Sequence, residues 1–174
     1  DGVGRRTLGS QTGEGFLSLV ELFVKAAKAH SAKLAIVDRA TGSRVTYKAA
    51  LLRSLVLERK LRACDKGLVG VMIPTSAGAI LTVVAAVMSG RTPVMINYST
   101  GAAQNCELAK RRLGFRTIIT SRALLTRLKI DKQDGMIFIE DLAGSVSLLD
   151  KALGFIRASA SAERSTACCP ARCR

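Results

Sequence analysis

Apolar residues recur along the chain in two alternating patterns, one typical of helices and one typical of strands. From residue 16 to residue 29 they recur every three or four positions with lysines between them, which predicts an amphipathic helix. Short runs rich in β-branched residues predict strands. Extended along the chain, the pattern predicts helices at residues 16–29, 47–63, 77–88, 100–113 and 122–128, and strands at residues 34–37, 44–46, 68–73, 93–96, 116–120 and 136–139.

Turn and capping residues separate these segments. The polar stretch at residues 40–43 divides the first two strands, which predicts a hairpin. Thr46 and Ser76 each precede a helical segment and are candidate N-caps. Residues 67–90 carry no charge, and about 20 uncharged apolar residues would be long enough to span a membrane. The turn at residues 74–76 interrupts this run, so we interpret it as a strand, a turn and a buried helix.

Alternation of strands with helices predicts an α/β fold made of βαβ units, with a mainly parallel sheet and helices on both faces. Such sheets bind ligands at the carboxyl ends of their strands. The candidate substrate-side residues are therefore those that follow predicted strands: Pro74, Thr75, Ser76, Asn97, Tyr98, Ser99, Thr120 and Ser121. We expect a flexible leader at residues 1–15, one folded unit at residues 16–153 and an irregular tail at residues 154–174.

The charge of the chain restricts its partners. Its 174 residues include 27 Lys and Arg against 13 Asp and Glu, a formal net charge of +14, which favours nucleic acid, an acidic protein or an anionic membrane. Aromatic residues make up only 4% and Trp is absent, which disfavours nucleic acid. Residues 110–129 include seven basic residues and no acidic one. These seven form either a solvated face or a docking surface for an acidic partner: Lys110, Arg111, Arg112, Arg116, Arg122, Arg127 and Lys129.

Motifs for catalysis or metal binding are lacking. No stretch fits a P-loop, and the glycines at residues 13–15 follow no predicted strand. His30 is the only histidine, so no catalytic triad and no histidine-rich metal site can be formed. Cys64 and Cys106 fall on helical segments among apolar neighbours, and the other three cysteines crowd residues 168–173 without further ligands. We expect no metal site, no catalytic residue and a reducing, cytoplasmic environment.

Five segments together resemble a known superfamily. They are RVTY at 44–47, LLRSLVL at 51–57, GVMIPTS at 70–76, GRTPVMIN at 90–97 and IITSR at 118–122. In order and spacing they resemble the start of the adenylate-forming (AMP-dependent) synthetases and ligases. NYSTGAA at 97–103 makes the resemblance closest to the acyl-acyl carrier protein synthetases, including the form fused to a 2-acylglycerophosphoethanolamine acyltransferase.

The resemblance implies the first part of a larger N-terminal domain in an acyl-activating enzyme. Such an enzyme uses ATP and Mg to join a fatty acid to AMP, then transfers it to acyl carrier protein or CoA. The superfamily's phosphate loop, adenine segment, ribose-binding Asp and catalytic Lys would lie beyond Arg174, so we expect a fragment that is inactive alone and binds no cofactor. As part of a larger protein it would lie in the cytoplasm, with peripheral contact at the inner face of the cell membrane. The alternative is a non-enzymatic basic module that binds an acidic carrier protein, anionic lipid or nucleic acid.

Overall fold

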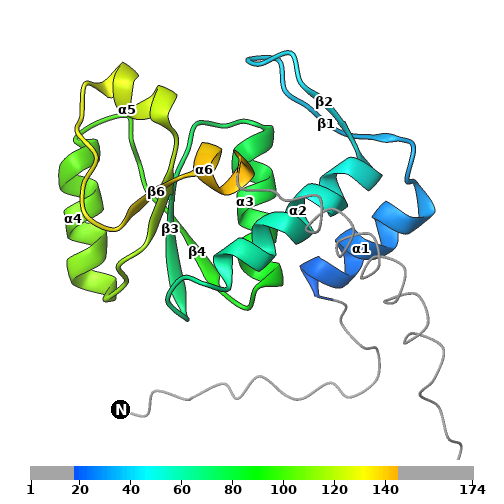
Figure 1. Ribbon diagram of the computed structural model, residues 1–174, viewed down its shortest axis with the longest axis horizontal. Helices are drawn as coiled ribbons and strands as arrows, with labels where there is room; N and C mark the ends of the chain where they lie inside the picture. Colours follow the sequence, from blue (N-terminus) through cyan, green and yellow to red (C-terminus); the bar gives the residue numbers. More distant parts are fainter. Residues whose placement is uncertain (1–17, 145–174) are drawn as a thin grey trace, which may run out of the picture.

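Twelve helices and strands make up the part of the chain that the computed structural model describes, residues 18–144 (Figure 1). Their bounds are α1 (Leu19–Ala29), β1 (Leu34–Val37), β2 (Arg44–Thr46), α2 (Tyr47–Leu61), β3 (Leu68–Met72), α3 (Ala77–Met88), β4 (Thr92–Met95), α4 (Ala102–Leu113), β5 (Ile118–Thr120), α5 (Arg122–Leu128), β6 (Met136–Phe138) and α6 (Ile139–Gly144).

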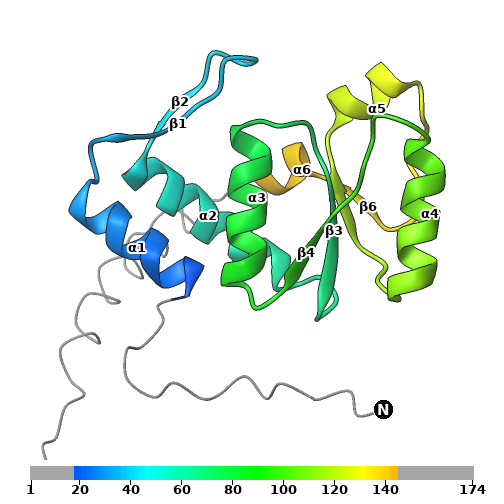
Figure 2. The same ribbon diagram turned by 180° about the vertical axis from the view of Figure 1, so that it is seen from behind.

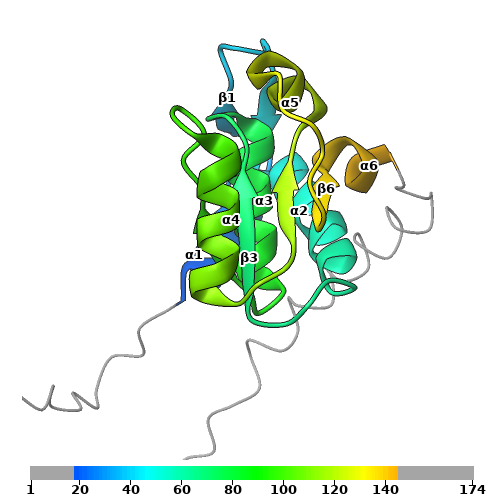
Figure 3. The ribbon, with the colours of Figure 1, turned by 90° about the vertical axis from the view of Figure 1, so that its left-hand side faces the viewer.

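Four of the strands form one parallel sheet in the order β4-β3-β5-β6. Helices α4 and α5 lie on one face of this sheet, and α2 and α3 lie on the other (Figures 1 and 3). The predicted α/β fold, with its parallel sheet covered on both faces, is therefore confirmed.

The strands of this sheet alternate their side chains between two separate cores. Val71 and Ile119 face α2 and α3 and belong to one buried cluster. Met72 and Ile118 face the other way and are buried in a second cluster that includes Cys106 of α4. The sheet is thus packed on both sides, as its almost continuously apolar strands require.

Gly70 of β3 leaves room for three side chains of the second core to pack against the strand. A Cβ atom placed at Gly70 would lie 2.9 Å from side-chain atoms of Ile118, Ile96 and Phe115. Such a distance is shorter than any ordinary van der Waals contact. Any larger residue at this position would push the packed side chains away from the sheet.

A third layer lies outside α2 and consists of α1 and the antiparallel β1–β2 hairpin (Figures 1 and 2). Helix α1 begins with a capping box, in which Ser18 and Glu21 each accept a hydrogen bond from the other's backbone N–H. In β1 a bulge sets Ala35 and Ile36 together against the body of the protein. The predicted hairpin is therefore present and anchored by its inward side chains.

Most predicted bounds agree with the structure, and a few differ. The helices at 77–88 and 122–128 have the predicted bounds, and Thr46 and Ser76 are N-caps as expected. The prediction was wrong at residue 139, where β6 has ended and the unpredicted helix α6 begins. Within residues 18–144 no helix is long and apolar enough to cross a membrane. The leader at residues 1–15, the tail at residues 154–174 and its cysteines lie outside the described residues.

Candidate functional site

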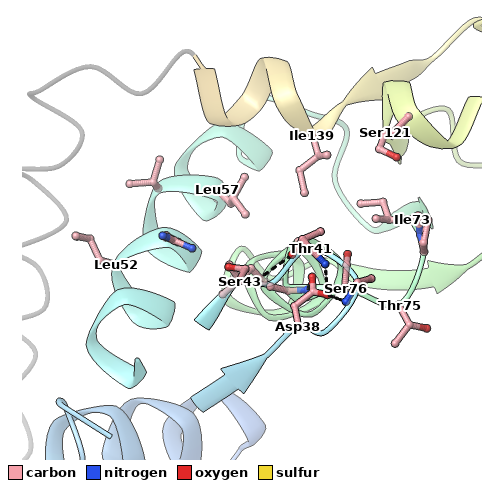
Figure 4. Close-up of a pocket in the computed structure, with 18 residues that line it drawn as sticks. Asp38, Thr41, Ser43, Leu52, Leu57, Ile73, Thr75, Ser76, Ser121 and Ile139 are labelled. Atoms are coloured by element: carbon pink, nitrogen blue, oxygen red, sulfur yellow. Dashed lines mark hydrogen bonds between the residues drawn. The ribbon is translucent and has the colours of Figure 1, made fainter. Parts of the chain in front are cut away.

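A cavity of about 890 Å³ lies beside the carboxyl end of β3 (Figure 4). Five parts of the chain line it: the turn of the β1–β2 hairpin, the middle of α2, the segment from the end of β3 into α3, the start of α5, and the start of α6. Cavities that hold small molecules measure roughly 300–1,000 Å³ and often lie at this edge of an α/β sheet. We take this cavity as the candidate functional site.

The loop from β3 to α3 gives the cavity one of its walls. Pro74 ends the strand, and Ser76 begins the helix by accepting a hydrogen bond from the N–H of Ala79 at 3.2 Å. Ser121 does the same at the start of α5, where its Oγ accepts from the N–H of Leu124 at 3.2 Å. These hydroxyl groups fix the helix starts beside the cavity.

Asp38 joins the hairpin turn to the start of α3. One carboxylate oxygen accepts hydrogen bonds from the N–H groups of Ala40 and Thr41, and the other accepts from the N–H of Ala77 at 3.0 Å (Figure 4). The bond from Ala77, helped by those from Thr41 and Ala40, holds the pKa of Asp38 below its usual value. A carboxylate of the protein thus already occupies the helix end that could otherwise receive a phosphate group.

Apolar side chains form most of the remaining wall. They come from α2, from the end of β3, from α3 and from α6, and they are Leu52, Val56, Leu57, Ile73, Leu81 and Ile139. Arg53 stands among them on α2 and is exposed to solvent. The cavity therefore suits a ligand with an apolar body, and Arg53 supplies a positive charge for an anionic end.

The cavity has no residues arranged for acid–base or nucleophilic catalysis. Three of its hydroxyl groups cap helices or turns: those of Ser76 and Ser121 at helix starts, and that of Thr41, which accepts from the N–H of Ser43 at 3.4 Å. His30 lies beside the ring of Tyr47 and does not line the cavity. Among the residues that line the cavity, no histidine or unengaged carboxylate lies next to a hydroxyl group. What the arrangement can do is hold a molecule.

The structure brings together only part of the predicted substrate-side set. Pro74, Thr75 and Ser76 line the cavity, and so does Ser121. The predicted loop from Asn97 to Ser99 does not line it.

This second loop at residues 97–99 makes contacts of its own. The Asn97 side chain accepts from the N–H of Ser99 at 2.9 Å, and its carbonyl accepts from the Asn105 side chain at 2.9 Å. Tyr98 packs against the core on the α4 side of the sheet. Both loops follow parallel strands, but they open on different faces of the sheet.

The seven basic residues of the predicted docking surface divide between opposite ends of the sheet (Figure 1). At the amino ends of the strands are the four residues that end α4 and precede β5: Lys110, Arg111, Arg112 and Arg116. At the carboxyl ends are the three on or just after α5: Arg122, Arg127 and Lys129. The chain crosses the sheet through β5 between the two groups, so they do not form one continuous patch.

Two of these basic residues have local partners. Lys110 donates to the carbonyl of Asp134 at 2.6 Å and pairs with Glu107. Arg122 pairs with Asp141 and lies over the ring of Phe138, 4.2 Å from its centroid. Arg111, Arg112 and Arg116 are exposed. Arg127 and Lys129 are exposed too, so the prediction of an acidic partner applies to two separate groups of basic residues, of which these three arginines are the larger.

Cys64 and Cys106 have the surroundings of core residues. Burial raises the pKa of both thiols, which keeps them protonated and unreactive near neutral pH. The Cys106 thiol lies 3.4 Å from the sulfur of Met72 inside the second core. Among residues 18–144 no group of His, Cys, Asp and Glu side chains could hold a metal ion.

The sequence analysis missed several residues of the cavity, notably Asp38, Arg53, Leu57 and Ile139. An Asp two residues before the hairpin turn is a signal for a side chain that accepts from turn N–H groups, and it could have drawn attention to Asp38. Arg53 and Leu57 lie one helical turn apart, but nothing local shows that α2 crosses the end of β3. Their position depends on tertiary packing.

Comparison with known proteins places the fold. No protein-family model matches the chain. The nonribosomal peptide synthetase FmoA3 in its AMPPNP-bound form matches 79% of this chain with a TM-score of 0.65 and 20% identity. The N-terminal subdomain of Klebsiella oxytoca NpsA, in complex with 3-hydroxybenzoyl-AMSN, matches 78% of it with a TM-score of 0.61 and 14% identity.

These matches span only part of the other proteins. The aligned region covers 15% of the FmoA3 chain and 35% of the NpsA chain. At 20% and 14% identity, these two neighbours show the fold of the chain. The chain therefore shares its α/β fold with part of the nonribosomal peptide synthetase FmoA3 and with part of the NpsA N-terminal subdomain.

Proposed function

We propose that the chain is the N-terminal part of an ATP-dependent ligase that activates a fatty acid. The complete enzyme would form an acyl-adenylate and then a thioester with acyl carrier protein or CoA. The shared fold supports the reaction class, and the motifs at residues 70–76 and 90–103 support the acyl-acyl carrier protein synthetase type. The Mg and ATP of that reaction would be bound by other parts of the enzyme, because no phosphate loop occurs in this sequence.

The lining of the cavity is the observation that carries the fatty acid assignment. An amino acid substrate would bring an ammonium group that needs a carboxylate or carbonyl partner when it leaves water. Asp38 is the one carboxylate among the lining residues, and both its oxygens already accept backbone N–H groups. An acyl chain needs only apolar contacts, which α2, β3 and α3 supply, and its carboxylate would meet Arg53.

The acceptor in this proposal is a thiol on an anionic carrier. Both acyl carrier protein and CoA carry negative charge, and the exposed Arg111, Arg112 and Arg116 offer positive charge to either.

Binding of a fluorescent fatty acid to the purified 174-residue chain tests the proposal. We expect saturable binding of cis-parinaric acid that palmitate reverses and leucine does not. Ala123→Trp, an exposed position on α5 that lines the cavity, should abolish this binding. Ala63→Trp, exposed and outside the cavity, is the matched control and should retain it. Equal binding by the two variants would disprove the assignment of this cavity.

The ligase itself can be tested in a chimera. Residues 18–144 replace the equivalent segment of an acyl-acyl carrier protein synthetase, and ATP–pyrophosphate exchange is measured with palmitate and with amino acids. We expect exchange with palmitate that falls at least about tenfold in the Ala123→Trp chimera. A folded chimera that exchanges only with amino acids would contradict the fatty acid assignment while leaving the adenylate-forming class in place.

A further inference from the structure

The outermost layer of the protein, formed by α1 and the β1–β2 hairpin, exposes large apolar side chains. Leu19 and Leu22 on α1 are 63% and 51% exposed, and Leu34 and Val37 on β1 are 42% and 55% exposed. Half of the exposed large hydrophobic residues in the described part of the chain thus fall within 19 consecutive positions. Because α1 and the hairpin lie on the same side of α2 (Figures 1 and 2), these side chains expose apolar area in one layer of the protein, and exposed apolar area of this kind marks an interaction site.

The geometry of the two elements explains why these side chains point away from the core. Phe23 of α1 packs against the core that α2 and α3 share, which leaves Leu19 and Leu22 outside it. The bulge in β1 turns Ala35 and Ile36 together toward the body, so Leu34 and Val37 on either side of them face outward. The exposure of the four residues is therefore built into both elements.

Basic side chains surround these apolar ones. Residues 18–48 contain six Lys and Arg residues and two carboxylates. Five of the basic residues are exposed on the two elements or the loops beside them: Lys25, Lys28, Lys33, Arg39 and Arg44. Both carboxylates accept backbone N–H groups, Glu21 from Ser18 at 2.7 Å and Asp38 at the hairpin turn.

We propose that α1 and the β1–β2 hairpin form a docking surface for an anionic lipid membrane. Exposed leucines can enter the boundary between headgroups and acyl chains while lysines and arginines contact anionic headgroups. Nucleic acid would use the positive charge, but it would gain nothing from Leu19, Leu22, Leu34 and Val37 and would lack aromatic platforms. None of these four apolar side chains lines the cavity, so the proposal does not depend on which ligand the cavity holds.

Sedimentation with lipid vesicles tests this proposal on the full 174-residue chain. We expect binding to vesicles of phosphatidylcholine with about one third phosphatidylglycerol, and at least tenfold weaker binding to pure phosphatidylcholine. The double variant Leu19→Ser with Leu22→Ser should weaken binding at least about tenfold, because two apolar side chains no longer leave water. Its matched control is Leu108→Ser with Leu113→Ser, two leucines of similar exposure on α4, which should bind as the parent does.

Charge-reversal variants distinguish binding through this surface from the general attraction of a basic protein to anionic vesicles. Since the chain carries +14, a nonspecific contact would be weakened equally by reversal at any exposed site. We expect Lys25→Glu with Lys28→Glu to reduce binding at least about tenfold, and Arg111→Glu with Arg112→Glu to reduce it less than threefold. Equal losses in the two variants would overturn the proposal.

Two further readouts complete the test. All four variants should melt within about 3 °C of the parent, because the substituted side chains are exposed. Ala123→Trp should bind vesicles normally, which distinguishes a failure of the membrane surface from a failure of the cavity. If the α1 variants instead abolish a dimer seen by ultracentrifugation and vesicles are not bound, the surface meets a second copy of the chain and the proposal is wrong.

Discussion

A single carboxylate, that of Asp38, holds together two segments that lie 39 residues apart in the sequence. It accepts from Ala40 and Thr41 within its own turn and from Ala77 at the start of α3. The inward side chains of the hairpin anchor its strands to the core, but they do not include the residues of its turn. The bond to Ala77 fixes its tip over the cavity, so a local turn residue also shapes the candidate site.

Replacement of Asp38 by Asn should lower the melting temperature at pH 7 by several degrees. An amide can accept through one atom only and would turn its NH₂ group toward backbone N–H donors. Because the folded pKa of Asp38 is lowered, its contribution is complete above its usual pKa of 3.8 and is lost as the pH falls through the lower folded value. The difference between parent and variant, followed by circular dichroism, should therefore shrink below about pH 4.

Asp65→Asn is the matched control, since Asp65 is exposed and its side chain makes none of the described hydrogen bonds. We expect its melting temperature to follow that of the parent at every pH. A difference between parent and Asp38→Asn that persists unchanged at pH 2.5 would mean that the effect does not come from the charged carboxylate.

Among the secondary-structure elements, the ends of α2 and α3 are joined through the buried side chain of Arg91. Its guanidinium donates to the carbonyls of Cys64 and Asp65 after α2, at 2.6 and 3.0 Å, and to Ser89 after α3 at 3.0 Å. The carboxyl ends of helices carry partial negative charge, so they stabilise the cation without an acidic side chain. One side chain thereby links the carboxyl ends of two helices, at the residue directly before β4.

Substitution of Arg91 by Met should reduce the free energy of unfolding by about 2–3 kcal/mol, because the part-buried carbonyls that it satisfies lose a charged donor. The free energy of unfolding of Arg91→Lys should lie between those of Arg91→Met and the parent, since an ammonium group keeps the charge but lacks the planar fork of a guanidinium. Urea unfolding at fixed protein concentration measures both. Arg112→Met, at an exposed position, should change stability by less than about 0.5 kcal/mol, and a similar loss in Arg112→Met and Arg91→Met would refute the role of the buried guanidinium.

Local sequence signals were sufficient to predict most helices and strands, but they did not predict how these elements pack together. Ser76 and Ser121 give clear helix starts, and the bounds of α3 and α5 follow from them. Helix α6 was missed because it begins at Ile139 directly after β6, with no turn residue between them. Most of the cavity lining was likewise missed, since residues such as Arg53 and Leu57 reach it through the packing of α2, which leaves no periodic signal.

For the whole molecule, the two edges of the parallel sheet differ. In β4 the N–H groups of Thr92 and nearby Ile96 point to β3, so Pro93 falls where the N–H would point outward. Proline has no N–H to offer a further strand, which protects this edge. The β6 edge has no such residue. Any strand that extends the sheet will therefore add beside β6.

We expect the purified chain to self-associate as its concentration rises, because an unprotected strand edge pairs readily with another chain. Sedimentation velocity from micromolar to millimolar protein should show growing dimers or larger species. Amide hydrogen exchange should slow at β6 and stay unchanged at β4. A single monomeric species across this range would show that the β6 edge does not pair with another copy in solution.

The order of strands in the sheet bears on how the protein is made. Strand β4 pairs with β3, β5 pairs with β3 on its other side, and β6 pairs with β5. Each strand thus joins one that has already left the ribosome, and none must wait for a later partner. Synthesis and folding of the parallel sheet can therefore proceed together. Strand β3 is the first strand of this sheet to be synthesised, and both strands after β4 add on the same side of it.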